Sequence, residues 1–363
     1  MVGRGRSSRK SRLVVNPTQL IAGLPKAELH LHLEGSLRAA TVVELAARHG
    51  VKVTEREVVE RYRYADFHGF LEAYKWVTSF LRAPADYALA TERLAEELLA
   101  QNVVYAEVTL SSGVMLWRGQ DADANLAAVH EAGLRARRRG LWMQWIPDAT
   151  RQFGAEAAVA VARHAARCKP LGVVAFGMGG DELSVPAEEF RAAYEYAAEQ
   201  GLHRVTHAGE IGGPEEVRLA IEVLGAERIG HGIAVMHDPL VREQLRFFGK
   251  VLEICPTSNL RTGALAKQLG RPNVGIEDHP LRTFFAEEVP FTISTDDPAM
   301  FHTSLNEEYA LLLRLGFTLE DVALLAALAV FKAFLPDADK LDLGRRIQSE
   351  VAKAGIMLPV SWL

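Results

Sequence analysis

The feature that most constrains the fold is a repeated alternation of short apolar runs and longer helical patterns along the 363-residue chain. Runs rich in β-forming residues predict strands at 27–33, 103–110, 141–149, 173–180, 203–210, 228–233, 251–259 and 291–298. Each run is followed by sequence with helical periodicity. Eight such units predict an α/β protein, a (β/α)8 TIM barrel, whose active site would lie at the C-terminal ends of the strands.

Two segments exceed what a minimal barrel needs. The interval 34–102 contains the helical patterns "AATVVELAARHG" and "FHGFLEAYKWVTSFL", which predict a helical insertion after the first strand, over the barrel mouth. After Pro298 the pattern is helical to near the end, which predicts extra C-terminal helices. We expect residues 1–15 to be a disordered basic tail and residues 16–363 to form one domain, since no repeat or linker interrupts them.

Composition excludes several classes of partner and setting. A formal net charge of −5 does not indicate the positively charged surface that nucleic-acid-binding proteins carry. Two cysteines, Cys168 and Cys255, cannot build a disulfide framework, which favours a reducing, cytoplasmic setting. The basic N-terminal segment lacks the apolar stretch of a signal peptide, and the longest apolar run, 322–331, is shorter than the ~20 residues that cross a bilayer. We therefore expect no membrane partner, and a buried helix at that run.

Histidines and carboxylates gather at the predicted strand ends. His30 and His32, two residues apart, share one side of the first strand, although such a pair alone is also compatible with ordinary packing. The fifth strand ends in "THAGE" with His207, the sixth in "GHG" with His231, and the eighth in "TDDP" with Asp296. Because these ends meet at one rim of a barrel, we predict that they form a metal site.

The ligand types predict which metal is bound and what it does. Neutral imidazoles with one carboxylate suit zinc, with a coordination position left for water, and therefore hydrolytic chemistry. Two-metal hydrolases on similar barrels usually carry a bridging ligand after the fourth strand. Here that strand is followed by Gly179, Gly180, Asp181 and Glu182, so we predict one ion per chain. The Pro-Cys-x-x-Cys pattern of cytidine-type deaminases is absent from the sequence, which argues against base editing of nucleic acid.

Six motifs carry a resemblance to a known family. They are "HLHLEGS", "GDE", "THAGEIGG", "RIGHGI", "CPTSN" and "STDDP". Their order and spacing resemble the adenosine deaminase family of the amidohydrolase superfamily over about residues 24–335. The resemblance implies hydrolytic deamination of a 6-aminopurine nucleoside to the 6-oxopurine and ammonia.

The resemblance also implies roles for individual residues. Zinc would be bound by the side chains of His30, His32, His207 and Asp296. His231 would orient or deprotonate the attacking water, and Glu210 would protonate the purine N1, which requires a raised pKa in a dry pocket. Asp297 would hydrogen-bond N7, and the backbone of Gly180 would meet N3.

Simpler structural roles remain open for three of these acidic residues. Glu210 could instead cap a helix that begins near Pro214. Asp181 and Glu182 could be solvated charges at a helix start, or they could brace the loop in which they lie.

The substrate is less closely specified by the sequence. Glu34 stands where adenosine deaminases usually have an aspartate that contacts the ribose 5′-hydroxyl. The second and third strand ends, "YAEVTLSSGVMLWRGQ" and "WIPDATRQFG", resemble the branch that deaminates 6-amino-6-deoxyfutalosine in menaquinone biosynthesis. The benzoate group of 6-amino-6-deoxyfutalosine would bind best to an aromatic surface and a cation, which Trp117, Arg118 and Arg151 could supply. Both arginines could equally be exposed loop charges.

Other family activities rank lower. Adenosine deamination in purine salvage is the first alternative. A free-adenine deaminase would need a closed pocket without a sugar site, and an AMP deaminase would need a phosphate cradle that the sequence does not show. A catalytically inactive member that acts as a binding protein is the alternative from another class, and the intact ligand and acid residues argue against it.

Overall fold

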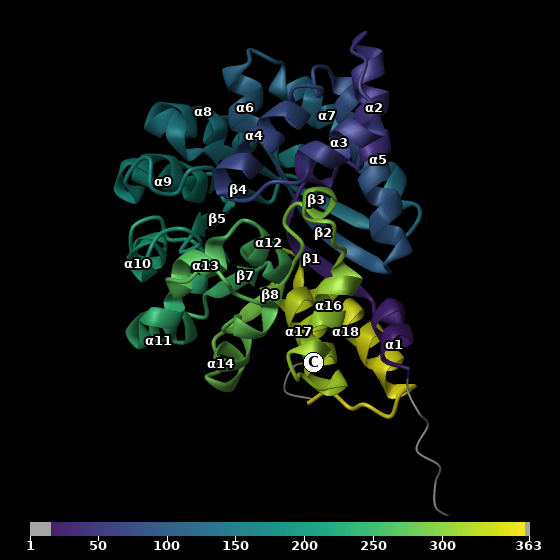
Figure 1. Ribbon diagram of the computed structural model, residues 1–363, viewed down its shortest axis with the longest axis vertical. Helices are drawn as coiled ribbons and strands as arrows, with labels where there is room; N and C mark the ends of the chain where they lie inside the picture. Colours follow the sequence, from purple (N-terminus) through teal and green to yellow (C-terminus); the bar gives the residue numbers. More distant parts are fainter. Residues whose placement is uncertain (1–15, 360–363) are drawn as a thin grey trace, which may run out of the picture.

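The computed structural model describes residues 16–359, so the predicted tail at 1–15 lies outside the described residues. Eight parallel strands occur in the order β1 to β8 around the sheet (Figure 1). They are β1 (Lys26–His32), β2 (Val103–Leu110), β3 (Trp142–Thr150), β4 (Ala175–Gly179), β5 (His203–Ala208), β6 (Arg228–His231), β7 (Val251–Ile254) and β8 (Phe291–Ile293). All eight predicted strands are present, and the predicted (β/α)8 barrel is confirmed.

Several strands end earlier than predicted because the residues that follow bend into the site. Pro256 already begins a helix after β7, where the prediction ran on to residue 259. After β8, Asp296 adopts a left-handed backbone conformation with φ 66°, which a strand cannot contain. Element ends are thus where the hydrophobic pattern is least informative.

The barrel closes between its first strand and the segment after its last. The backbone N–H of His32 donates to the carbonyl of Asp296 at 2.8 Å, and the N–H of Asp296 donates to the carbonyl of His30 at 3.1 Å. The hydroxyl of Ser294 accepts from the N–H of His30 at 3.2 Å. Closure therefore carries Asp296 directly beside the two histidines of β1.

Helices surround the strands. Those that follow β2 to β7 are α6 (Ser112–Trp117), α7 (Ala122–Arg137), α8 (Gly154–Arg167), α9 (Arg191–Glu199), α10 (Pro214–Glu222), α11 (Pro239–Phe247), α12 (Pro256–Arg261), α13 (Ala264–Leu269) and α14 (Leu281–Ala286). Short 3-10 helices lie between them: η2 (Arg151–Phe153), η3 (Lys169–Leu171), η4 (Ala187–Phe190), η5 (Ile233–His237) and η6 (Ile276–Asp278). Together they bury the outward faces of the strands.

The insertion predicted between the first two strands is helical. It comprises η1 (Glu34–Ser36), α2 (Ala39–Arg48), α3 (Glu55–Arg61), α4 (Phe67–Thr78) and α5 (Pro84–Ala100). Local signals fix its helix starts: Thr54 and Glu57 form a capping box on α3, and Asp66 accepts from the N–H of Gly69 at the start of α4. The helix α4 contributes residues to the cavity described below.

The C-terminal region is also helical, as predicted. It contains α15 (Pro298–Phe301), α16 (Leu305–Arg314), α17 (Leu319–Lys332) and α18 (Asp337–Ala352), and α1 (Pro17–Gly23) packs beside α16 and α18 (Figure 1). The helix α17 packs against β1 and β8 and contains the apolar run that we predicted as a buried helix. Within residues 16–359, no helix is long and apolar enough to cross a membrane.

Candidate active site

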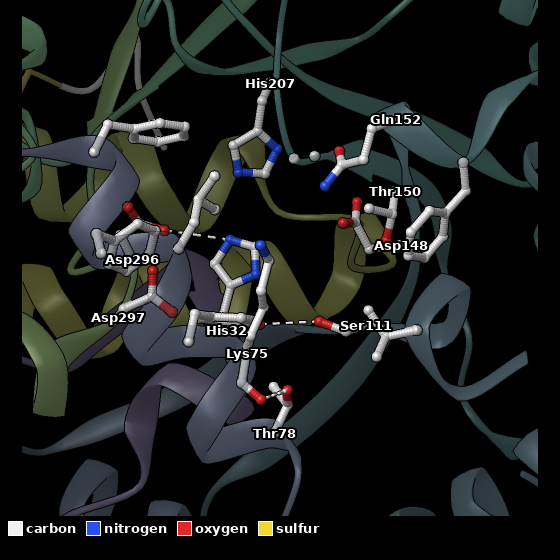
Figure 2. Close-up of a pocket in the computed structure, with 18 of the residues that line it drawn as sticks. His32, Lys75, Thr78, Ser111, Asp148, Thr150, Gln152, His207, Asp296 and Asp297 are labelled. Atoms are coloured by element: carbon white, nitrogen blue, oxygen red, sulfur yellow. Dashed lines mark hydrogen bonds and ion pairs between the residues drawn. The ribbon is translucent and has the colours of Figure 1, made fainter. Parts of the chain in front are cut away.

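Four predicted metal ligands meet at the C-terminal ends of the strands. His30 and His32 come from β1, His207 from β5 and Asp296 from the segment after β8, and their ligand atoms all lie within 4.8 Å of one another. The Nε2 atoms of His30 and His32 are 3.4 Å and 3.2 Å from Oδ1 of Asp296. Figure 2 shows His32, His207 and Asp296 around one region of the cavity. These residues form what we call the metal-ligand cluster.

The cluster fits a bound cation on its own chemistry. Nε2 of His30 is buried and has no hydrogen-bond partner within the described part of the chain, so an acceptor atom of the imidazole is available to a metal ion. Although burial alone would raise the pKa of Asp296, the neighbouring imidazoles of His30 and His32 hold that pKa well below its usual range. An ionised carboxylate among imidazoles is a ligand set typical of transition metals.

Neighbouring groups hold the ligands in place. Nδ1 of His30 lies 2.9 Å from Oε2 of Glu253, whose other oxygen accepts from Nε of Arg228 at 2.5 Å. Nδ1 of His207 lies 3.0 Å from the carbonyl of Met178. Such contacts to the second nitrogen fix which imidazole nitrogen faces a metal.

Two residues of the site adopt strained backbone conformations. His231 and Asp296 have φ angles of 59° and 66°, in the left-handed region that side chains other than glycine rarely adopt. Ser258 donates to Oδ2 of Asp296 at 2.7 Å, and Nδ2 of Asn259 lies 3.0 Å from Nδ1 of His231. Both contacts hold these side chains in the orientations that the backbone imposes.

Glu210 and His231 face the cluster from β5 and β6. Nε2 of His231 lies 3.7 Å from Oε2 of Glu210 and 3.8 Å from Oδ2 of Asp296. Burial, together with the charges of Asp296 and Glu182, raises the pKa of Glu210 to about 8. Burial lowers the pKa of His231 to about 3, so its imidazole is neutral. The site thus combines a protonated acid and a neutral base.

The loop that carries Glu210 is held by Glu182, and Glu210 itself does not cap the helix that follows. The carboxylate of Glu182 accepts from the N–H groups of Gly209, Ile211 and Gly212, the last two at 2.8 Å each. The N-cap of α10 is Gly213, so Glu210 is free to face the cavity. Of the two roles left open for Glu182, the structure therefore supports bracing.

Asp297 and the glycines beside it show how tightly the site is packed. Asp297 is buried, and its Oδ1 has no hydrogen-bond partner among the described residues. A Cβ on Gly35 would lie 1.6 Å from that oxygen, so only glycine fits there. Gly180, with φ 97°, also lines the cavity and packs against Gln152.

A cavity of about 480 Å³ connects the metal-ligand cluster to the inserted helices. Its inner part is lined by His32, His207, Glu210, His231, Asp296 and Asp297, and its outer part by Phe67, Phe70, Tyr74, Trp117, Arg118 and Phe153. The rings of Trp117 and Phe153 stack with centroids 5.5 Å apart. Arg118 lines the cavity, but its guanidinium donates to the backbone carbonyl and hydroxyl of Thr78 at 2.6 Å and 3.2 Å.

Two predicted substrate residues lie elsewhere. Arg151 is buried and does not line the cavity. Its Nη1 donates to the carbonyl of Glu182 and to Oε2 of Glu216, so it holds the segment that carries Glu182. Glu34 is buried behind the cavity wall, where its carboxylate accepts from the N–H of Ser111 at 3.0 Å and from the hydroxyl of Tyr74 at 3.3 Å. We therefore correct both expectations: neither side chain faces the substrate cavity.

Sequence reasoning did not single out four other residues of the site. Asp148, Gln152 and Lys75 line the cavity, and Glu253 orients His30. The position of Asp148 at the end of the third predicted strand was a usable signal, because polar strand ends were the criterion applied elsewhere. Lys75 lies on an inserted helix, and no local pattern indicates which helix reaches the mouth.

Comparisons with known proteins agree with this geometry. The family described as adenosine deaminase matches residues 25–353. An aminodeoxyfutalosine deaminase from Streptomyces coelicolor is 38% identical over 92% of this chain and 86% of its own length. An adenine deaminase from Agrobacterium fabrum is 34% identical over 89% of this chain and 98% of its own length. The crystal structure of an adenine deaminase from Arthrobacter aurescens has a TM-score of 0.85 at 29% identity, with 91% of this chain and 99% of that chain covered.

Fold, site and relatives thus lead to one assignment. The barrel has the expected strand order, three imidazoles and one carboxylate meet at its rim, and the family match spans almost all of the described residues. The chain belongs to the adenosine deaminase family and is a hydrolytic deaminase of purine bases or nucleosides.

Proposed function

We propose that the protein is a zinc-dependent deaminase of 6-aminopurine nucleosides whose preferred substrate is 6-amino-6-deoxyfutalosine. The observation that carries this proposal is the cavity of about 480 Å³, which continues from the metal-ligand cluster past Asp148 to an aromatic wall formed by Phe67, Trp117 and Phe153. A free base would occupy only the inner part of this space. The similarity to aminodeoxyfutalosine deaminases supports the same substrate.

The ligands of the zinc ion would be His30, His32, His207 and Asp296. When bound, such an ion supplies a hydroxide-like nucleophile at neutral pH by acidifying water. His231, neutral and 3.8 Å from Asp296, lies where it can orient the attacking water and accept its proton.

Glu210 would act as the proton donor. Its pKa of about 8 means that the carboxyl group carries a proton at neutral pH, and burial beside the cluster keeps that proton from solvent. Protonation of the purine N1 makes C6 more electrophilic, so water adds there. The C6–N bond then breaks, and the products are the 6-oxopurine and ammonia.

Two further groups would hold the purine edges. Burial and the charge of Asp296 raise the pKa of Asp297 well above its usual range, so this carboxyl group can donate a hydrogen bond to N7. The backbone at Gly180 lines the cavity next to Gln152 and would meet N3. Donors at both edges orient C6 toward the cluster.

The outer cavity offers a place for the benzoate of 6-amino-6-deoxyfutalosine. The stacked rings of Trp117 and Phe153 provide an aromatic surface, and Trp117 is 69% exposed, so it has room for a further ring. Lys75 lines the cavity, and among the described residues its ammonium group pairs only with Glu72, in an exposed ion pair at 2.7 Å. A ligand carboxylate could replace that weak pairing.

A second candidate function is deamination of free adenine, because the adenine deaminase from Agrobacterium fabrum is 34% identical to this chain and the one from Arthrobacter aurescens has the same fold, with a TM-score of 0.85. The test is kcat/KM for the zinc-loaded enzyme on 6-amino-6-deoxyfutalosine, adenosine and adenine, followed by loss of the 6-aminopurine absorbance. We expect the futalosine compound to be the best substrate. A preference for adenosine would indicate purine salvage, and a preference for adenine would refute the nucleoside proposal.

A further inference from the structure

One buried carboxyl group in the cavity has no role in the chemistry described above. Asp148 lies on β3 and is only 7% exposed, yet it lines the cavity. Within residues 16–359 its side chain forms no ion pair, and burial raises the pKa of this carboxyl group well above its usual range although the backbone N–H of Gly179 donates to it. A buried carboxyl group with so few partners is costly unless a ligand completes its hydrogen bonds.

The neighbouring strand is shaped to accommodate this group. Asp148 pairs with Gly177 of β4, and Gly179 is the next residue on the same face. A Cβ on Gly177 would lie 2.9 Å from Oδ1 of Asp148, and a Cβ on Gly179 would lie 3.1 Å from Oδ2. Two glycines thus leave space in which the carboxyl group lies flat against β4, so its orientation is set by the fold.

The position of Asp148 relates it to one part of a bound nucleoside. In Figure 2, Asp148, Thr150 and Gln152 lie on the side of the cavity opposite Asp296 and Asp297. Gln152 is already engaged, because its Oε1 accepts from the N–H of Asp181 at 3.0 Å. With C6 held at the metal-ligand cluster, the sugar would extend into the rest of the cavity, which Asp148 also lines.

We propose that Asp148 binds the 2′- and 3′-hydroxyls of the substrate ribose and so distinguishes a nucleoside from a free purine base. This proposal rests on the proposed nucleoside deaminase function. A carboxyl group presents two oxygens that can form hydrogen bonds with two adjacent hydroxyl groups, and acidic side chains bind a ribose hydroxyl in dinucleotide-binding folds. Free adenine carries no hydroxyl group, so it would leave Asp148 unpaired in the cavity.

The test is a comparison of enzyme variants and substrate hydroxyls. We would measure kcat/KM of the wild type, Asp148→Ala and Asp148→Asn on adenosine, 2′,3′-dideoxyadenosine and adenine. Asp342→Asn is a matched control, because Asp342 lies on α18 in an exposed ion pair with Arg345. Metal content and melting temperature are measured for each variant, and Asp148→Asn keeps the side-chain volume if the alanine variant is unstable.

For the wild type we expect adenosine to exceed dideoxyadenosine in kcat/KM by about 10-fold to 100-fold, the usual effect of two hydrogen bonds. Asp148→Ala should reduce this ratio to within about 3-fold, mainly by lowering the value for adenosine, and Asp148→Asn should give an intermediate ratio. Asp342→Asn should match the wild type.

Two results would overturn the assignment of Asp148. One is a wild-type enzyme that does not distinguish adenosine from dideoxyadenosine. The other is an equal loss of kcat/KM on both nucleosides in the Asp148 variants at wild-type metal content, since a role in folding or metal binding would have that effect. A wild type that prefers free adenine to every nucleoside would instead refute the proposed function itself.

Discussion

Replacement of Glu210 by glutamine tests the central chemical step. Glutamine has nearly the same shape but cannot transfer a proton, while Gln268 still donates to the backbone carbonyl of residue 210 at 3.0 Å, so the loop should keep its position. General acid catalysis contributes about 10²-fold to 10⁴-fold. We therefore expect kcat to fall by that factor, which corresponds to about 3–5 kcal/mol in the barrier, with metal content unchanged.

The pH profile gives the same experiment a second readout. The pKa of Glu210 is raised from 4.5 to about 8, so the free enzyme carries the proton below that pH and loses it above. The wild-type kcat/KM should therefore decline on the alkaline side, and because a bound cation lowers the pKa of a nearby carboxyl group, the midpoint should lie at or below about pH 8. Glu210→Gln should lack this decline.

The assay is steady-state deamination across pH with metal analysis of each preparation. Glu199→Gln, at an exposed position on α9, is the matched control and should behave as the wild type. A Glu210→Gln enzyme with near-normal kcat, or with an unchanged alkaline decline, would refute the assignment of Glu210 as the proton donor.

Three further variants probe the site and its support. His30→Ala should lose bound metal and activity together, as measured by metal analysis and turnover; retained metal would contradict its role as a ligand. Glu253→Gln removes one of the two carboxylates that pair with buried Arg228, the other being Glu107. We expect a loss of about 1.5–3 kcal/mol in urea unfolding and metal binding weakened by about 10-fold to 100-fold, and no change in either would contradict the role of Glu253 in holding His30. Gly35→Ala would place a Cβ 1.6 Å from Oδ1 of Asp297, so kcat/KM should fall at least about ten-fold, whereas Gly213→Ala, with no atom within 4 Å of its Cβ, should have little effect.

The ligand set and the fold could be predicted because both follow local rules. Apolar runs at a regular spacing predict a barrel, and a barrel brings strand ends together, so His30, His207 and Asp296 could be placed at one rim from their positions alone. The raised pKa of Glu210 was expected from the role that the family resemblance implies, since a carboxyl group that donates a proton at neutral pH needs a dry pocket.

The substrate arm could not be predicted in this way. Arg151 and Glu34 follow strands whose ends form the site, but neither side chain faces the cavity. Arg151 donates to the carboxylate of Glu216, and the carboxylate of Glu34 accepts from the hydroxyl of Tyr74. The direction of a loop side chain depends on which partners the rest of the fold places around it, and those partners are distant in sequence. The position of Asp148 at a strand end is visible in the sequence, but the space that Gly177 and Gly179 leave for its carboxyl group is not.

The sequence by itself determined the barrel, its helical insertion and the residues that meet at the strand ends, because period-2 and period-3.6 patterns and strand order are properties of the chain. Only the tertiary structure decided which polar groups face the cavity and which are used to brace it. Three features depend on contacts between elements that are distant in sequence. They are the left-handed backbone of Asp296, the hydrogen bonds from the Glu210 loop to Glu182, and the packing of Asp148 against two glycines of β4. Such contacts arise only when the strands close into a barrel.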